Sequence, residues 1–133
     1  MVRHLAVFDK GTIDLIFGGK KKIEGRFSQI RIPPFGKAAS GDLVWMKVSG
    51  GKIEGQFTID RVFYFDHPQG QELLYIKKKY AKDMAMPAAF WLSHEKVNYV
   101  TLMFIKSVTR FIVPPEVAKK DLRPWVVLPA FGI

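Results

Sequence analysis

Residues 53–65 read IEGQFTIDRVFYF, a run dominated by the β-branched and aromatic side chains that are typical of a strand. Phe57 and Ile59 would share one face of this strand, whereas Val62 would lie on the other. The apolar face therefore changes near Asp60-Arg61. Such a change within one strand predicts a β-bulge or a bend, which β-barrels use to turn corners.

Other segments along the chain also have strand character. They are residues 4–8, 23–28, 43–48, 99–108 and 125–128. Between the second and third of these, residues 29–41 contain Pro33-Pro34, Gly36 and Ser40-Gly41. These residues interrupt helices and strands, so they predict a long, basic loop. The sequence Ile-Glu-Gly-x-Phe occurs at residues 23–27 and again at 53–57, each time after a glycine turn. Each copy is a glycine turn followed by a strand, and this similar local chemistry explains the repeat.

Helical spacing occurs in two places. An apolar stripe predicts a helix over residues 69–84, with lysines pointing elsewhere, and the stripe consists of Leu73, Ile76, Tyr80 and Met84. A short helix is predicted to begin at a cap, Asp9 or Thr12, and to end at Gly18-Gly19. A further short turn is predicted from Pro87 to Leu92. Strands dominate without regular βαβ alternation. The predicted fold class is therefore mainly β with short helices (α+β), a small, mainly antiparallel β-barrel with helices packed at its ends.

Length and composition limit the classes of protein to consider. The chain has 133 residues, 48% of them apolar, which predicts a single domain over residues 1–133 and excludes a disordered chain. Cysteine is absent, which excludes disulfide scaffolds, cysteine nucleophiles and cysteine-bound metals. The three histidines are far apart in sequence, so we expect no metal site, and the sequence predicts no cofactor.

The charge of the chain indicates an anionic partner. Lys and Arg number 21 against 12 Asp and Glu, giving a net charge of +9. This excess favours nucleic acid or another anion, although a lysine-rich surface that serves only solubility would have the same composition. Residues 1–9 lack the apolar core of a secretion signal, and the uncharged stretches are too short to span a bilayer. We therefore expect a cytoplasmic protein that does not bind membranes.

The densest group of charges lies in residues 19–26, GKKKIEGR. Strand alternation predicts Glu24 and Arg26 on one face and Lys21 on the other. Four cations around one carboxylate are costly unless an anionic ligand also binds there. Residues 19–28 are thus expected to form one wall of the largest cleft. The alternative is a Glu24–Arg26 surface pair among solvated lysines.

This segment resembles a known motif. Gly19-x-Lys21-x-x-Glu24-x-Arg26, followed after a loop by Gly41-Asp42 at the start of a strand, resembles the ASCH family of the PUA-like superfamily. The resemblance implies a small PUA-like β-barrel with associated helices. It also implies binding of RNA or a modified nucleotide in a cleft that contains the motif.

The same resemblance implies an alternative, enzymatic function. Some small bacterial ASCH proteins are amidohydrolases that act on N4-acetylcytidine and use the motif lysine, a threonine three residues later and a distal glutamate. Lys21 matches the lysine, but Glu24 stands at the threonine position. If this chain is an enzyme, Lys21 and Glu24 are the candidate catalytic residues. Glu72 and Glu95 are candidates for the distal carboxylate, although Glu72 at a helix start more simply stabilises the helix dipole.

Binding of RNA or of a modified nucleoside requires cations for phosphates and aromatic faces for unpaired bases. The candidate binding residues are Lys20, Lys21, Lys22, Glu24, Arg26, Arg31, Lys37, Trp45 and Trp91. Phe35 and the lysines at 77–79 and 82 could add to this surface. We therefore carry forward an RNA-binding or nucleotide-binding module as the first hypothesis, an amidohydrolase as the second, and a structural or protein-interaction role as the third.

Overall fold

The computed structural model describes residues 1–117 and 123–129. Six strands and three helices occur in these residues, and most of the predicted bounds are close to those observed. In chain order they are β1 (Arg3–Phe8), α1 (Lys10–Phe17), β2 (Ile23–Ser28), β3 (Leu43–Val48), β4 (Ile53–Asp66), α2 (Gly70–Met84), α3 (Ala88–Ser93), β5 (Tyr99–Arg110) and β6 (Trp125–Val127).

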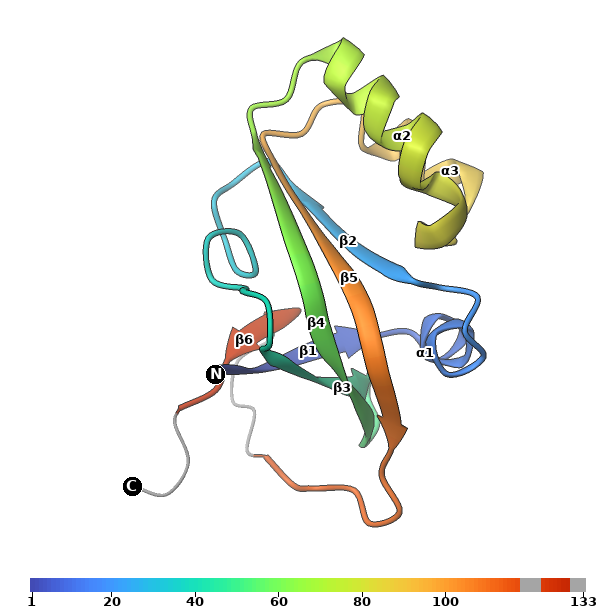
Figure 1. Ribbon diagram of the computed structural model, residues 1–133, viewed down its shortest axis with the longest axis vertical. Coiled ribbons are helices and arrows are strands. Elements are labelled where there is room, and N and C mark those ends of the chain that lie inside the picture. Colours follow the sequence, from blue (N-terminus) through green and yellow to red (C-terminus); the bar gives the residue numbers. More distant parts are fainter. Residues whose placement is uncertain (118–122, 130–133) are drawn as a thin grey trace.

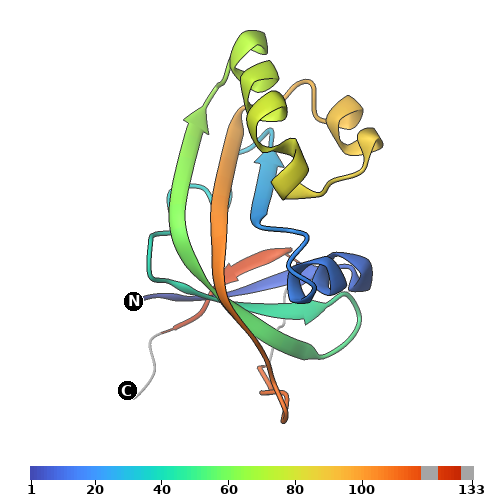
Figure 2. The ribbon, with the colours of Figure 1, turned by 45° about the vertical axis from the view of Figure 1, so that its right-hand side comes forward.

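The strands form one mixed sheet in the order β2-β5-β4-β3-β1-β6. Four of the five pairings are antiparallel, and β1 pairs with β3 in parallel. The sheet bends into a half-barrel because its two long strands, β4 and β5, curve along the whole molecule while β1, β3 and β6 cross near one end (Figures 1 and 2). The predicted mainly antiparallel barrel with helices is confirmed as a half-barrel, with β2 and β6 as the edges of the opening.

The predicted irregularity in β4 is also present. The register between β4 and β5 shifts between Ile59 and Val62, which includes the predicted site at Asp60-Arg61. A bulge at this point increases the local twist and bend of the strand. The bend lets β4 belong to both halves of the sheet, so that β3 pairs with its first half and β5 continues to its end.

Two of the three apolar clusters in the described residues involve the helices and lie toward the two ends of the half-barrel. Helix α1 begins at its N-cap Asp9, whose side chain accepts a hydrogen bond from Thr12 N, and buries Ile13 and Ile16 in a cluster with residues of β1, β3, β4 and β5. Helix α2 buries the predicted stripe over β2 and β5, together with residues of α3. Figure 1 shows α2 and α3 at the end away from β1, β3 and β6. Strand β2 therefore lies between α1 and the α2–α3 pair.

The repeated Ile-Glu-Gly-x-Phe segments have a shared packing role. In each segment the glycine leaves space for a side chain from a helix. A Cβ atom on Gly25 would lie 2.5 Å from Met84 Cε of α2, and one on Gly55 would lie 2.6 Å from Phe17 Cζ of α1. The space above Gly25 is thus filled by Met84.

We expect alanine substitutions at Gly25 and Gly55 to have different effects on the stability of the protein. At Gly55 the added methyl group would also lie 2.5 Å from the backbone oxygen of Thr109, which cannot move without breaking the sheet, whereas Met84 has a flexible end. We expect Gly55→Ala to destabilise the protein by about 1–3 kcal/mol or more, and Gly25→Ala to cost clearly less. Urea denaturation followed by circular dichroism measures both. Equal losses of stability would contradict this packing account.

Candidate functional site

Glu24 lies on β2 between two cations. Its Oε1 atom lies 3.4 Å from Lys21 Nζ, and its Oε2 atom accepts hydrogen bonds from Arg26 Nε at 3.3 Å and Arg26 Nη2 at 3.2 Å. The side chains of Lys21 and Glu24 are 0% and 4% exposed, and that of Arg26 is 21% exposed. The structure therefore brings the three central motif residues together, with both oxygens of the buried carboxylate paired to cations.

Lys21 differs from its predicted orientation. Strand β2 begins only at Ile23, so strand alternation does not extend to Lys21, which lies in the preceding turn. Its amine turns to the same side as Glu24, donates a hydrogen bond to the carbonyl of Met84 at the end of α2, and lies 3.4 Å from Met86 Sδ. A cation at the C-terminal end of a helix interacts favourably with the helix dipole. Lys21 thus holds the start of β2 to the end of α2.

Arg26 spans the opening of the half-barrel. Its Nη2 atom donates to Val7 O of β1 at 3.1 Å, and its guanidinium carbon lies 4.9 Å from the ring centre of Phe8 and 5.0 Å from that of Trp125. These distances are typical of cation–π contacts. One side chain on β2 therefore contacts β1 and β6, which lie at the other edge of the sheet.

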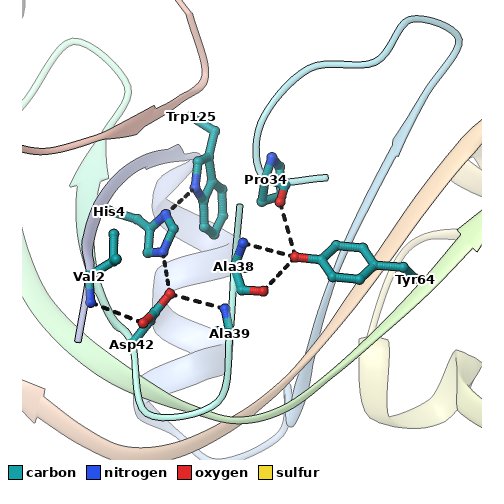
Figure 3. A network of polar contacts seen from close by, with 8 residues as sticks. All are labelled: Val2, His4, Pro34, Ala38, Ala39, Asp42, Tyr64 and Trp125. Atoms are coloured by element: carbon teal, nitrogen blue, oxygen red, sulfur yellow. Dashed lines mark hydrogen bonds and ion pairs between the residues drawn. The ribbon is translucent and has the colours of Figure 1, made fainter. Parts of the chain in front are cut away.

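The indole beneath Arg26 is held by a buried polar network, drawn in Figure 3. Trp125 Nε1 donates to His4 Nδ1 at 3.0 Å, so His4 carries its proton on Nε2, which donates to Asp42 Oδ2 at 2.9 Å. Asp42 also accepts from the backbone amides of Val2 and Ala39, each at 3.0 Å. Asp42, which the motif resemblance included, thus acts on the site through His4 and Trp125.

The loop 29–41 is held to β4 by hydrogen bonds to Tyr64. The Tyr64 hydroxyl accepts from Ala38 N at 2.8 Å and donates to Ala38 O at 2.5 Å (Figure 3), and burial raises the pKa of this hydroxyl. Phe35 packs edge-on against Tyr64, with ring centres 5.0 Å apart, and the Arg31 guanidinium lies over Phe35 at 4.9 Å. Arg31 and Lys37 are exposed on this loop.

A cleft of about 230 Å³ opens beside the motif. Its walls come from the end of β1 and start of α1, from β2, and from the residues around α3. They are Val7, Phe8, Asp9, Thr12, Glu24, Gly25, Arg26, Phe27, Met86, Phe90 and His94. A wider hollow of about 700 Å³ shares Asp9, Thr12, Met86, Phe90 and His94 with the cleft. Arg26 and Phe27 also border a hollow of about 70 Å³ next to residues 32–35 of the loop.

The predicted wall is therefore only partly correct. Residues 24–27 line the cleft, whereas Lys21 lies buried behind it. The motif cleft is also not the largest by volume, because the adjoining hollow occupies about 700 Å³ and a further hollow of about 410 Å³ lies at the far end of the sheet between residues 47–53 and 113–117. We regard the smaller cleft as the candidate site, since it combines Arg26 and Glu24 with aromatic side chains, a mixture typical of ligand sites.

Phe90 and His94 form the aromatic wall opposite the motif, and sequence reasoning missed both. Their rings stack with centres 4.2 Å apart at 30°, and Phe27 packs edge-on against Phe90 at 5.0 Å. His94 Nδ1 lies 2.7 Å from Phe90 O, so it donates to this carbonyl, and Nε2 of the neutral ring is then a hydrogen-bond acceptor. The only available signal was the turn predicted from Pro87 to Leu92, which contains Phe90 and ends two residues before His94, and this turn was given no role.

The remaining candidates do not gather at the cleft. Lys20 and Lys22 are exposed beside the motif, and Trp91 is half-buried against Phe27, with ring centres 5.8 Å apart. Trp45 is buried at the opposite end, where it packs with Leu5 and Ile53. Of the two distal glutamates, Glu72 takes part in the capping box of α2 and Glu95 is exposed.

Neither a metal-binding cluster nor a membrane-spanning helix occurs in the part of the chain that the structure describes. Within residues 1–117 and 123–129, His, Asp and Glu side chains do not gather in groups of three that could hold a metal ion. In the same residues the helices are too short or too polar to cross a membrane.

Comparisons with known proteins concern the fold. No family model matches the sequence, and no curated protein matches it significantly. The crystal structure of ASCH from Zymomonas mobilis has a TM-score of 0.71 at 14% identity, covering 96% of this chain and 87% of that chain. The chain has the ASCH fold. Two mutants of the same protein, one serine-to-alanine and one tyrosine-to-phenylalanine, match with TM-scores of 0.71 and 0.68 at 13% identity, covering 96% of this chain and 88% and 90% of theirs. The resemblance inferred from the motif is thereby confirmed for the ASCH fold.

The burial of Glu24 predicts a large effect on stability. Glu24→Gln would leave the Lys21 ammonium buried without its carboxylate, and removal of one partner of a buried pair costs about 3–5 kcal/mol. The matched control is Glu54→Gln, the same position in the repeated segment. Glu54 pairs with Lys10 at 2.7 Å and raises the pKa of Lys10 by this hydrogen bond, but the pair is exposed and should contribute little. Similar denaturation midpoints for the two variants would contradict the assignment of Glu24.

Proposed function

We propose that this protein binds RNA or a modified nucleotide and holds one unpaired base in the cleft beside Glu24 and Arg26. The observation that carries the proposal is the composition of the cleft. A partly exposed guanidinium on one wall faces a wall of stacked aromatic rings, Phe90 and His94. Proteins that bind unpaired bases use aromatic or guanidinium planes for stacking and polar groups for the base edges.

The size and polarity of the cleft fit one base. Pockets for drug-sized ligands occupy about 300–1,000 Å³, and the cleft is smaller than this range at about 230 Å³. Arg26 supplies donors and His94 Nε2 an acceptor, so that a base edge carrying both kinds of group could be paired from two sides. The adjoining hollow of about 700 Å³ gives room for the ribose and phosphate outside the cleft.

The loop 29–41 supports contact with phosphates. The small hollow that begins at Arg26 leads to residues 32–35, and the exposed cations Arg31 and Lys37 lie on the same loop. Contacts to phosphates carry no sequence information and add to affinity for any nucleic acid. The net charge of +9 is consistent with such a polyanionic partner.

The amidohydrolase alternative has less support from the geometry. A catalytic lysine must reach the substrate, but the Lys21 amine is buried, donates to the Met84 carbonyl and lies against Glu24. Release of acetate from N4-acetylcytidine by the wild-type protein would support this alternative and would count against a purely binding role.

The test of the proposal is loss of RNA binding when the aromatic wall is changed. Phe90→Leu keeps an apolar side chain but removes the ring, and a lost base–aromatic stacking contact costs about 1–3 kcal/mol. We therefore expect a weaker Kd, by roughly 5- to 150-fold, for a labelled single-stranded RNA measured by fluorescence anisotropy. The control is Phe111→Leu, because Phe111 is also half-buried but packs against Trp45 at the far end. Equal affinities for both variants and the wild type would overturn the assignment of the cleft.

A further inference from the structure

The outer face of α2 is rich in lysine. Ile76, Tyr80 and Met84 are buried against the sheet, whereas Lys78 and Lys82 lie one turn apart on the opposite side of the helix. Tyr75, which is 52% exposed, precedes Lys78 on this side. We call Tyr75, Lys78 and Lys82 the lysine face.

The charge of this face is not neutralised by the protein. Among the described residues, neither Lys78 nor Lys82 lies within 4.0 Å of a carboxylate, and the same is true of their neighbours Lys20, Lys22 and Lys77. On α2 itself the acidic residues are Glu72, which caps the first turn, and Asp83. Unpaired like charges on one surface raise the local positive potential and attract an anionic polymer.

The C-terminal end of α2, which carries the lysine face, leads to the wider hollow beside the cleft. The backbone amide of Lys22 donates to Asp83 O at 2.7 Å, and the Lys21 amine donates to Met84 O, so the last turn of α2 is fixed to the start of β2. Ala85 and Met86, which follow this turn directly, line the wider hollow beside the cleft. Figure 1 shows the end of α2 close to the start of β2. A single-stranded nucleic acid that leaves the cleft at this point would reach Lys22 and Lys82 first. It would reach Lys78 one helical turn later.

From this arrangement we propose that the lysine face binds the phosphates of single-stranded RNA whose base occupies the cleft. The inference rests on the proposed function and extends it from one nucleotide to a polymer. Lys78 and Lys82 are four residues apart, which separates them by about 6 Å along the helix axis, so each ammonium group can contact a different phosphate. Tyr75 adds an aromatic ring at the far end of the lysines, a combination typical of proteins that bind single strands.

A membrane surface fits the same face less well. Helices that lie on membranes insert an apolar face into the lipid and keep their lysines at the polar boundary. In α2 the apolar face is already packed on β2 and β5, and the lysines point away from it. The observations therefore favour single-stranded RNA, with its regularly spaced phosphates, over a membrane as the ligand of this face.

The experiment compares two double variants of equal charge. Lys78→Gln with Lys82→Gln changes the lysine face, and Lys47→Gln with Lys52→Gln removes two lysines that line the hollow at the far end of the sheet. Each phosphate contact to a single strand contributes about 0.7 to the slope of log K against log salt, so the first variant should lose about 1.4 from this slope. The electrostatic contribution of these contacts vanishes near 1 M salt. One decade lower, at about 0.1 M salt, the Lys78/Lys82 variant should therefore bind a twelve-nucleotide RNA roughly 25-fold more weakly than the wild type does.

A second ligand separates the inference from the proposed function. Cytidine monophosphate should bind the wild type and the Lys78/Lys82 variant with equal affinity, because the cleft is unchanged. An unchanged salt slope for RNA in the Lys78/Lys82 variant, or an equal loss in the Lys47/Lys52 variant, would overturn the inference while the cleft proposal stands. Failure of the wild type to bind either RNA or the monophosphate would overturn both. If the Lys78/Lys82 variant instead loses only binding to vesicles of phosphatidylcholine and phosphatidylserine in equal parts, the face serves membranes and the inference is wrong.

Discussion

The buried carboxylate of Glu24 is the group on which the arrangement of the other elements depends. A carboxylate with a 4% exposed side chain is tolerated only if cations and hydrogen-bond donors compensate for its lost hydration, and Lys21 and Arg26 do so from opposite sides. Each of these partners also binds a backbone carbonyl of another element. Lys21 contacts Met84 at the end of α2, and Arg26 contacts Val7 on β1. One ion cluster therefore fixes α2, β1 and β2 relative to one another.

This constraint also produces the cleft. The sheet is open between its edge strands β2 and β6, and Arg26 crosses that opening to the Trp125 ring. One part of the Arg26 guanidinium thus contacts Glu24, Val7 and Trp125, and the remaining part faces the cleft. The His4–Asp42 pair beneath Trp125 fixes the indole, so residues far from the cleft set the position of the group that would contact a base (Figure 3). Such support by buried hydrogen bonds is how binding groups are held in place before the ligand arrives.

Local patterns in the sequence were sufficient for the elements and for the fold class. Alternation, glycine turns and the helical stripe predicted β2, β3 and α2 closely, and the change of apolar face predicted the bulge in β4. The parallel pairing of β1 with β3 was not predicted, because strand order depends on contacts between distant segments. For the same reason His4 and Trp125, which lie at opposite ends of the chain, showed no sign of their hydrogen bond. Lys21 was placed on the wrong side because strand alternation was extended into a turn, and the Phe90–His94 wall could not be seen until α3 was placed opposite β2.

The central claim is that the cleft between β2 and α3, and not another hollow of the molecule, receives a nucleotide. The most direct test is a titration of isotope-labelled protein with a ribonucleoside monophosphate, followed by the NMR signals of backbone amides and of the Arg26 Nε–H group. We expect the largest shifts at Arg26, Phe27, Phe90 and His94. Shifts concentrated at Lys52 and Val117, which line the larger hollow at the far end of the sheet, would contradict it.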